Sequence, residues 1–141
     1  MKKHESSRAE KGQSIVEFGI SLVFILVLLA GTVDVARALF TYMDMREAAQ
    51  EGALYGSIYP ADTTGIANRV QGAATSSGIS PNSFNINVSL IGSPCTGNGI
   101  RVDVALNNFP ITTPFLGALI GTQTVSISAS ATDTILSPAC T

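Results

Sequence analysis

Charged residues are scarce in this sequence. They make up 13% of its 141 residues, which is about half of the ~25% that is usual in soluble domains. The deficit is concentrated in an apolar N-terminal segment and in a C-terminal half that is rich in Ser, Thr and Asn. The sequence has no strongly basic stretch of the kind that forms a nucleic-acid-binding face. The composition therefore predicts no nucleic-acid partner.

Histidine and cysteine are also rare. The single histidine, His4, lies near the N-terminus, and the two cysteines, Cys95 and Cys140, lie far from it along the chain. Two isolated cysteines and one distant histidine do not make a zinc site. We therefore expect no metal and no cofactor.

Catalytic groups are missing from residues 58–141. This part contains no histidine, and its few acids, Asp62, Asp103 and Asp133, show no shared spacing. An enzyme needs a nucleophile with a base, a pair of carboxylates or a set of metal ligands. No glycine-rich loop follows a strand and opens a helix, so the Gly92–Gly99 segment is predicted to be a turn rather than a phosphate-binding loop. We expect no catalytic residue, no enzyme activity and no small-molecule substrate.

Proline is absent from the stretch between Lys11 and Ser57, around which the chain is organised. This stretch begins polar, is apolar from Ile15 to Val33 with one carboxylate at Glu17, and becomes amphipathic from Asp34 onward. Its Leu, Ala, Met and Glu content favours a helix. A helix of roughly 40 residues would be about 60 Å long, whereas the hydrocarbon core of a bilayer is about 30 Å thick. About half of this helix must therefore leave the membrane.

Positive charge is distributed unevenly along the chain. All three lysines lie in residues 1–12, where basic side chains outnumber acidic ones by four to two. Basic residues that precede an apolar span favour the cytoplasmic side of the membrane. We therefore expect residues 1–12 to be a flexible leader and residues 13–33 to span the membrane once. The N-terminus would be cytoplasmic and the C-terminus exported.

Residues 34–57 are expected to form the emergent, amphipathic half of the helix. Asp34 and Arg37 stand three residues apart, so they share a helix face at the expected outer membrane boundary. An apolar stripe continues beyond them at helical spacing, as on a helix that buries one face. This stripe consists of Ala36, Leu39, Phe40, Met43 and Leu54.

Small residues recur every four positions near the end of this helix. Ala48, Gly52 and Gly56 therefore form a smooth ridge on one helix face. Such a ridge allows a second backbone to approach closely. That backbone could belong to another membrane subunit or to the sheet or second helix of the same chain, and the sequence leaves both alternatives open.

The remaining residues, 58–141, are expected to form a small exported head. Tyr59-Pro60 ends the long helix, because the residue before a proline is disfavoured in the α region. Asp62 can then cap a second helix that runs to about Ser76. A turn is predicted at residues 78–82, which include Gly, Ser, Pro and Asn.

Beyond this turn the hydrophobic period changes to two. Apolar and polar residues alternate over residues 84–90, 100–106 and 125–131, which predicts three strands with one apolar face each. Such strands form an antiparallel sheet with one face in water and the other packed on the emergent helix. Residues 110–121 are expected to be a long connection with one helical turn at 115–120. The predicted fold class is α+β.

The two cysteines can be placed on this topology. If the strands run up, down and up, the loop at residues 93–98 and the tail after Thr134 lie at the same end of the sheet. Cys95 and Cys140 would then be close together, in an exported compartment where disulfides persist. The bridge would close about 45 residues and would stabilise the head by roughly 3–4 kcal/mol. We therefore predict a Cys95–Cys140 disulfide.

A recognisable junction precedes the apolar run. Gly12, Glu17 and Phe18, in the sequence GQSIVEF, resemble the processing site of type IV prepilins. Just past the apolar run, VDVAR contains Asp34 and Arg37, and AAQEGA follows from Ala48 to Ala53. Together these features resemble the TadE-like minor pilins, or pseudopilins, of the tight-adherence (Flp-type) pilus machinery.

The resemblance covers roughly residues 11–56, about a third of the chain. It departs from the family pattern at two places. The family commonly has a proline a few residues after Glu-Phe, where this chain has Leu22-Val23-Phe24. The alanine-rich ending usually carries arginines where this chain has Gln50 and Leu54. The helix is therefore expected to be straighter and less basic than in typical members.

The resemblance implies a processing and assembly pathway. A prepilin peptidase of the inner membrane would cut between Gly12 and Gln13, which would create a positively charged α-amino group on Gln13. Glu17, which is costly in an apolar helix, would pair with the amine of an adjacent subunit. The implied partners are the peptidase, other pilin or pseudopilin subunits, the inner-membrane assembly platform and membrane lipid.

Two other readings of the N-terminus remain open. An uncleaved signal anchor would give the same membrane topology and leave a β-rich head that binds a partner or ligand in the cell envelope. A conventional signal peptide could be cut after Ala36-Arg37-Ala38, which fits an A-x-A pattern. The long apolar run, the internal Glu17 and the nearby Asp34 argue against the second reading.

Overall fold

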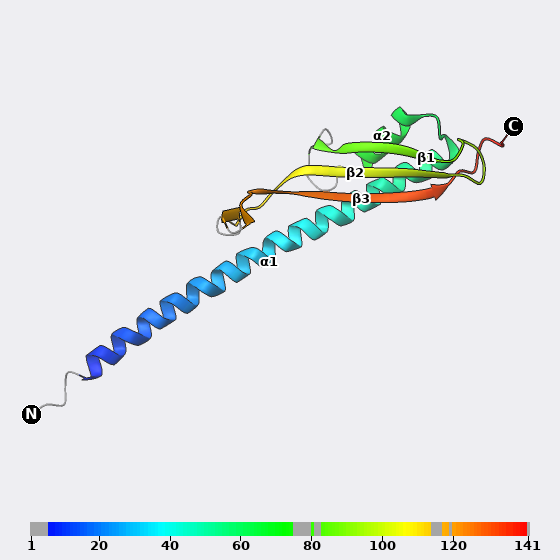
Figure 1. The fold of residues 1–141 in the computed structure, drawn as a ribbon. Helices are drawn as coiled ribbons and strands as arrows, with labels where there is room; N and C mark the ends of the chain where they lie inside the picture. Colours follow the sequence, from blue (N-terminus) through cyan, green and yellow to red (C-terminus); the bar gives the residue numbers. More distant parts are fainter. Residues whose placement is uncertain (1–5, 75–79, 81–82, 114–116, 119, 141) are drawn as a thin grey trace, which may run out of the picture.

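The long helix of the sequence is the longest element of the structure, a computed structural model that describes residues 6–74, 80, 83–113, 117–118 and 120–140 (Figure 1). This helix, α1, runs from Ser6 to Ile58 over 53 residues, which corresponds to about 80 Å. It begins before the predicted start at Lys11, so the expectation of a flexible leader is wrong for residues 6–12. Residues 6–11 contain Arg, Ala, Glu and Lys and no glycine or proline, and such residues extend a helix readily.

The second helix, α2, spans Thr63–Ala74 and follows α1 after a short turn. As predicted, α1 ends just before Tyr59-Pro60. Asp62 caps α2, because its Oδ1 accepts a hydrogen bond of 2.9 Å from the backbone N–H of Gly65. The predicted extension to Ser76 and most of the predicted turn at 78–82 lie outside the described residues.

Three antiparallel strands form the sheet, in the order β1-β2-β3. They are β1 (Asn85–Ile91), β2 (Gly99–Pro110) and β3 (Thr124–Thr134). Val102 of β2 pairs with Val88 on one side and with Ala131 on the other. The alternating pattern therefore gave the correct strands, and the α+β prediction is confirmed.

Beyond β2 the chain crosses to β3 through the connection at residues 111–123. Strand β2 continues to Pro110 beyond a register shift between Leu106 and Phe109, where an irregularity interrupts the pairing with β3. In the described part of the connection, Gly117, Ala118 and Ile120 are helical. The predicted helical turn is therefore present at these residues, while its other members lie outside the described part.

One face of the sheet packs on the C-terminal half of α1 and on α2 (Figure 1). The central strand supplies fully buried side chains at alternate positions, Ile100, Val102 and Val104. They meet Ile66 and Val70 of α2 in one core. The other members of this core are Met45, Ala48, Ala49, Ala53, Ala74, Phe84, Leu106, Phe109, Ala129 and Ile135.

The predicted apolar stripe on the emergent helix is wrong. Leu39, Phe40 and Met43 are 54%, 68% and 60% exposed, and Leu54 is exposed as well. The face of α1 that meets the sheet and α2 carries mostly small residues instead. Small side chains let the backbones approach closely, so the large apolar side chains are left on the outer face. Leu90 of edge strand β1, predicted to be on the apolar face of the sheet, is also exposed.

Candidate functional site

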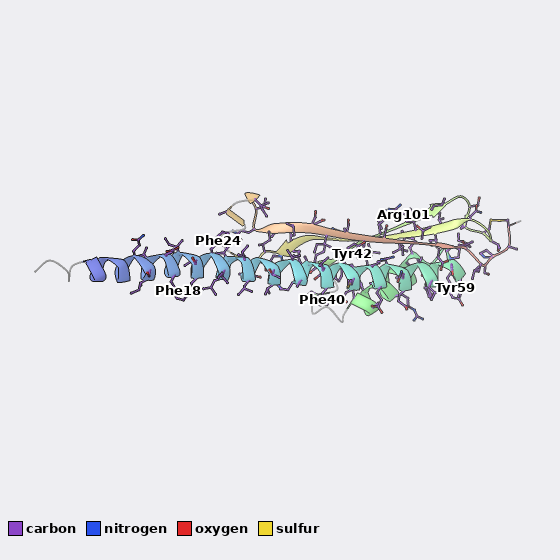
Figure 2. The ribbon with its side chains drawn as sticks, turned by 90° about the horizontal axis from the view of Figure 1, so that it is seen from below. Phe18, Phe24, Phe40, Tyr42, Tyr59 and Arg101 are labelled. Carbon is purple, nitrogen blue, oxygen red and sulfur yellow. A yellow bond between two sulfur atoms is a disulfide. The ribbon has the colours of Figure 1, made fainter. Side chains whose placement is uncertain are left out.

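The apolar half of α1 carries no covering domain. Between Gln13 and Val33 every side chain is exposed except Val27 and Gly31, which are partly covered. Phe18 and Phe24 project from the bare helix (Figure 2). Among the described residues, α1 is the one helix long and apolar enough to cross a membrane. An apolar surface of this size on a protein in water would be unfavourable, so this half requires a lipid or protein environment.

The predicted processing junction lies within this bare part of the helix. Gln13 and Glu17 are four residues apart, so both lie on one face of α1. Glu17 and Phe18 are exposed. The structure holds no second subunit, and the pairing of Glu17 with a neighbouring amine stays a prediction, as does cleavage after Gly12.

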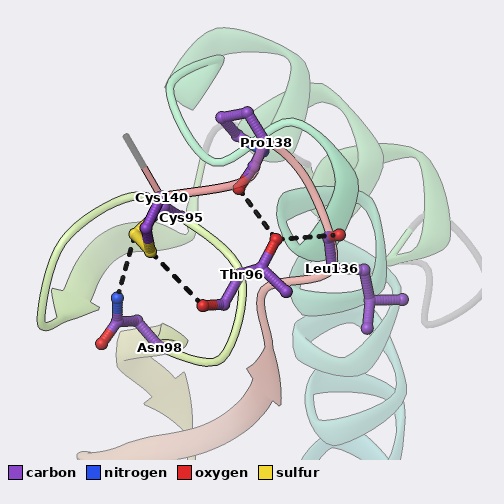
Figure 3. The surroundings of a disulfide bond; sticks show 6 residues. All are labelled: Cys95, Thr96, Asn98, Leu136, Pro138 and Cys140. Atoms are coloured by element: carbon purple, nitrogen blue, oxygen red, sulfur yellow. Dashed lines mark hydrogen bonds between the residues drawn. A yellow bond between two sulfur atoms is a disulfide. The ribbon is translucent and has the colours of Figure 1, made fainter.

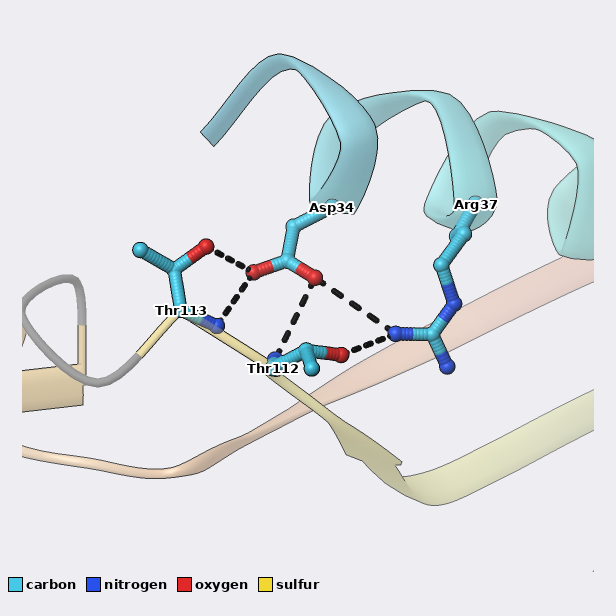
Figure 4. A network of polar contacts seen from close by, with 4 residues as sticks. All are labelled: Asp34, Arg37, Thr112 and Thr113. Carbon is cyan, nitrogen blue, oxygen red and sulfur yellow. Dashed lines mark hydrogen bonds and ion pairs between the residues drawn. The ribbon is translucent and has the colours of Figure 1, made fainter. Parts of the chain in front are cut away.

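Asp34 joins the long helix to the head through hydrogen bonds (Figure 4). The residue is only 7% exposed. One carboxylate oxygen, Oδ2, accepts hydrogen bonds from the backbone N–H of Thr113 at 2.7 Å and from the Thr113 hydroxyl at 2.6 Å. The other, Oδ1, accepts one from the backbone N–H of Thr112 at 3.2 Å. Asp34 therefore fixes the start of the β2–β3 connection to α1.

Arg37 completes this Asp34 network. Its Nη1 lies 3.5 Å from Oδ1 of Asp34 and donates to the hydroxyl of Thr112. Its guanidinium lies over the ring of Phe109, 5.5 Å from the centroid, where a cation is attracted to the π face. The predicted Asp34–Arg37 pair is thus present, and both members also bind the head.

Hydrogen bonding lowers the pKa of Asp34 to about 2, from an ordinary value of 3.8. The Thr113 hydroxyl contributes most, and the N–H groups of Thr113 and Thr112 add to it. Burial acts in the opposite direction, because it disfavours the charged form. The carboxylate therefore stays ionised at any physiological pH.

Sequence reasoning found Asp34 and Arg37 but missed Thr112 and Thr113. The two threonines lie 78 and 79 positions away from Asp34 along the chain, so no local pattern connects them. One signal was available: they form a polar pair between Pro110 and Pro114, in a stretch that is otherwise apolar up to Gly121. A polar pair in such a place needs a partner.

The ridge of small residues is used within the chain. Ala48, Gly52 and Gly56 are all buried. A Cβ on Gly52 would lie 2.5 Å from Val70 Cγ2, and one on Gly56 would lie 2.7 Å from Ile100 Cδ1. The ridge therefore packs against α2 and β2, which decides between the two alternatives that the sequence left open.

The predicted disulfide is present between Cys95 and Cys140, whose Cα atoms are 5.0 Å apart (Figure 3). The β1–β2 turn and the C-terminal tail meet there, as the strand order predicted. Thr96 strengthens the junction, because its N–H and its hydroxyl both donate to the carbonyl of Pro138. The N–H of Leu136 donates to the carbonyl of Ser57 at the end of α1. The tail is thus held to the end of the head opposite the Asp34 network.

A second capping contact closes the α1–α2 turn. The Tyr55 hydroxyl donates to Oδ2 of Asp62 at 2.9 Å. The bond from the N–H of Gly65, followed by this one, lowers the pKa of Asp62, and the bond to Asp62 raises the pKa of Tyr55. Both shifts follow from the hydrogen bonds at the start of α2.

No chemical centre emerges from the described part of the chain. Within it, no group of three or more His, Cys, Asp or Glu residues could hold a metal ion. An open groove lies between α1 and the end of β2, lined among others by Phe40, Asp44 and Asn108. Its lining combines apolar, amide, hydroxyl and charged side chains. The candidate functional site is therefore α1 itself, with the Asp34 network that joins it to the head.

The similarity to known proteins also lies in α1. Residues 12–54 match the family model of TadE-like proteins. The matched segment lies entirely within α1 and contains Gly12, Glu17, Asp34 and Arg37. Searches of curated proteins and of solved structures found no match. The match confirms the resemblance read from the junction, from VDVAR and from AAQEGA: residues 12–54 are similar to TadE-like proteins.

Proposed function

We propose that this protein is a minor pilin or pseudopilin, a structural subunit of a tight-adherence type pilus or of its assembly machinery. The observation that carries the proposal is the coincidence of two features on one helix. The TadE-like match covers residues 12–54. The same helix has an uncovered apolar half, followed by a half that contributes residues to the core of the folded head.

This division suits a subunit that starts in a membrane and ends in an assembly. The apolar half, residues 13–33, is long enough to span the hydrocarbon. The buried residues of α1, against which the head packs, all belong to the part that follows, from Asp34 onward. In the proposed state the N-terminus is cytoplasmic and the disulfide-bonded head is exported from the inner membrane.

The proposed processing step is cleavage between Gly12 and Gln13 by a prepilin peptidase. The product would carry a cationic amine on Gln13 and a carboxylate on Glu17. Glu17 would pair with the amine of an adjacent subunit, so that the acid is neutralised when the apolar helices bundle. The peptidase, other pilin subunits and the inner-membrane assembly platform are the partners in this proposal.

A second candidate is an uncleaved, signal-anchored envelope protein whose head binds a partner or ligand. The observation in its favour is the continuity of α1 through Gly12 back to Ser6. This candidate shares the membrane topology and differs at Gly12 and in assembly. Glu17 would have no subunit amine to meet in such a protein.

Replacement of Glu17 tests the assembly role. In cells that lack the native copy, Glu17→Ala should leave the protein in the membrane and cleavable but reduce the number of pili strongly, as counted by electron microscopy. Glu47→Ala is the matched control, because Glu47 is an exposed acid on the emergent half of the same helix. Normal piliation with Glu17→Ala would contradict the proposed role of this carboxylate.

A further inference from the structure

The β2–β3 connection is held at the depth where the apolar segment ends. Val33 is the last residue of that segment, and Asp34 follows it directly. The N–H groups of Thr112 and Thr113 both donate to the Asp34 carboxylate. If residues 13–33 lie in lipid, these two threonines therefore lie at the membrane surface.

The chain then continues past this level, toward the lipid. Figures 1 and 2 show the turn that contains Gly117, Ala118 and Ile120 as the part of the head nearest to the N-terminal end of α1. Val27 and Gly31 lie seven and three residues before Asp34, so they share its helix face. They are also the partly covered residues of an otherwise exposed segment. The connection therefore overlaps the apolar segment.

The composition of the connection fits a lipid environment. No charged residue occurs between Asp103 and Asp133. Ile120 points an apolar side chain outward, with 55% of its surface exposed. Two backbone N–H groups of the described part of the connection are paired: that of Gly121 donates to the carbonyl of Gly117, and that of Ile111 donates to the carbonyl of Gln123. Paired backbone groups and uncharged side chains lower the cost of entering the apolar side of the membrane interface.

We propose that this turn is a second membrane contact, in which Ile120 inserts into the headgroup–acyl boundary of the leaflet that faces the head. The inference rests on the proposed membrane span of α1. Together with the Asp34 network, the contact fixes how the head is rotated on the bilayer. The occupant of the surface is lipid, and a neighbouring protein subunit is the competing outcome.

Tryptophan fluorescence can test the contact, because the chain contains no tryptophan. Three single variants of the full chain are compared: Ile120→Trp in the turn, Phe24→Trp in the span and Leu136→Trp at the opposite end of the head. Leu136 is the matched control because its apolar side chain is also largely exposed, at 66%. Each variant is reconstituted in two series of phosphatidylethanolamine–phosphatidylglycerol vesicles, whose acyl chains are brominated either near the headgroup or near the chain end.

The proposal predicts that brominated lipid quenches Ile120→Trp, with blue-shifted emission and protection from aqueous acrylamide. Leu136→Trp should show the reverse behaviour. If Phe24→Trp is quenched by lipid but Ile120→Trp behaves like Leu136→Trp, the second contact is wrong while the span stands. Protection of Ile120→Trp from both quenchers would assign the surface to protein and also overturn the proposal. If Phe24→Trp escapes lipid quenching, the span itself fails, and the contact with it.

Discussion

The two halves of α1 differ in which side chains are exposed and which are buried. In residues 13–33 large apolar side chains surround the helix and none is covered fully by the head. In the half from Asp34 to Ile58, the buried face is made mainly of small residues, and large apolar side chains such as Phe40 and Met43 lie on the outer face. The first half needs an apolar environment from outside the chain. The second half provides a close-packed surface for its own sheet and α2.

The boundary between the halves is an electrostatic feature. Asp34 and Arg37 are the first charged pair after the apolar run, and both are engaged by the β2–β3 connection. A buried carboxylate that accepts several hydrogen bonds fixes a geometry more narrowly than apolar contact does. The head is thus placed along the helix by Asp34 and packed on it by the small residues that follow.

The largest expected difference between the halves comes from truncating one isoleucine in each. Ile100 is fully buried in the head, whereas Ile25 in the apolar half is exposed. Ile100→Ala should lower the free energy of unfolding of the head by about 2–5 kcal/mol, since it leaves a cavity. Ile25→Ala should leave it unchanged. Thermal unfolding of the full chain in detergent, followed by near-UV circular dichroism, measures both, and equal effects would contradict the division of α1.

A smaller effect is expected from adding one methyl group to a glycine. Gly52→Ala and Gly72→Ala both gain up to about 1 kcal/mol of helix propensity. A Cβ at position 72 meets no atom within 4 Å, whereas one at position 52 collides with Val70. Gly72→Ala should therefore stabilise the head, and Gly52→Ala should be less stable than Gly72→Ala by about 1–3 kcal/mol, as overpacking costs. Thermal unfolding followed by near-UV circular dichroism compares the two variants. Identical stabilities of Gly52→Ala and Gly72→Ala would show that the ridge is not closely packed.

The smallest expected effect is on the pH dependence of stability, through the single carboxylate of Asp34. The pKa of Asp34 is lowered to about 2 in the folded chain, against 3.8 ordinarily. A lowered pKa means that its contribution is present above pH 3.8 and is lost as the pH falls toward 2. Asp34→Asn should therefore lower the melting temperature at pH 7 and reduce its dependence on pH in that window.

Asp44→Asn is the control for this titration, since Asp44 lies on the same helix, outside the Asp34 network. It should leave the melting temperature at pH 7 close to that of the wild type. Asp62, whose pKa is also lowered, keeps part of the acid dependence in both variants. An Asp34→Asn profile that parallels the wild type would show that the network does not hold the head to the helix.

Much of this architecture could be predicted because its signals are local or periodic. The long proline-free stretch gave α1, and alternation gave β1, β2 and β3. The predicted strand order placed Cys95 near Cys140. The prediction that the apolar stripe is buried failed because the size of a side chain does not say which helix face is buried. The sheet and α2 pack on the face of α1 that carries small residues. The partners of Asp34 could not be found because they lie in a distant connection.

The most direct test of the account is the intact mass and N-terminal sequence of the native protein taken from membranes. The account predicts a chain that begins at Gln13, and a Gly12→Val variant that stays uncut while Gly19→Val is cut normally. An added Cβ meets no atom within 4 Å at either glycine, so a difference would report recognition by the peptidase. A chain that begins at Met1 or Lys2 would favour the uncleaved anchor, and one that begins at Leu39 would make the protein a secreted one and contradict the account.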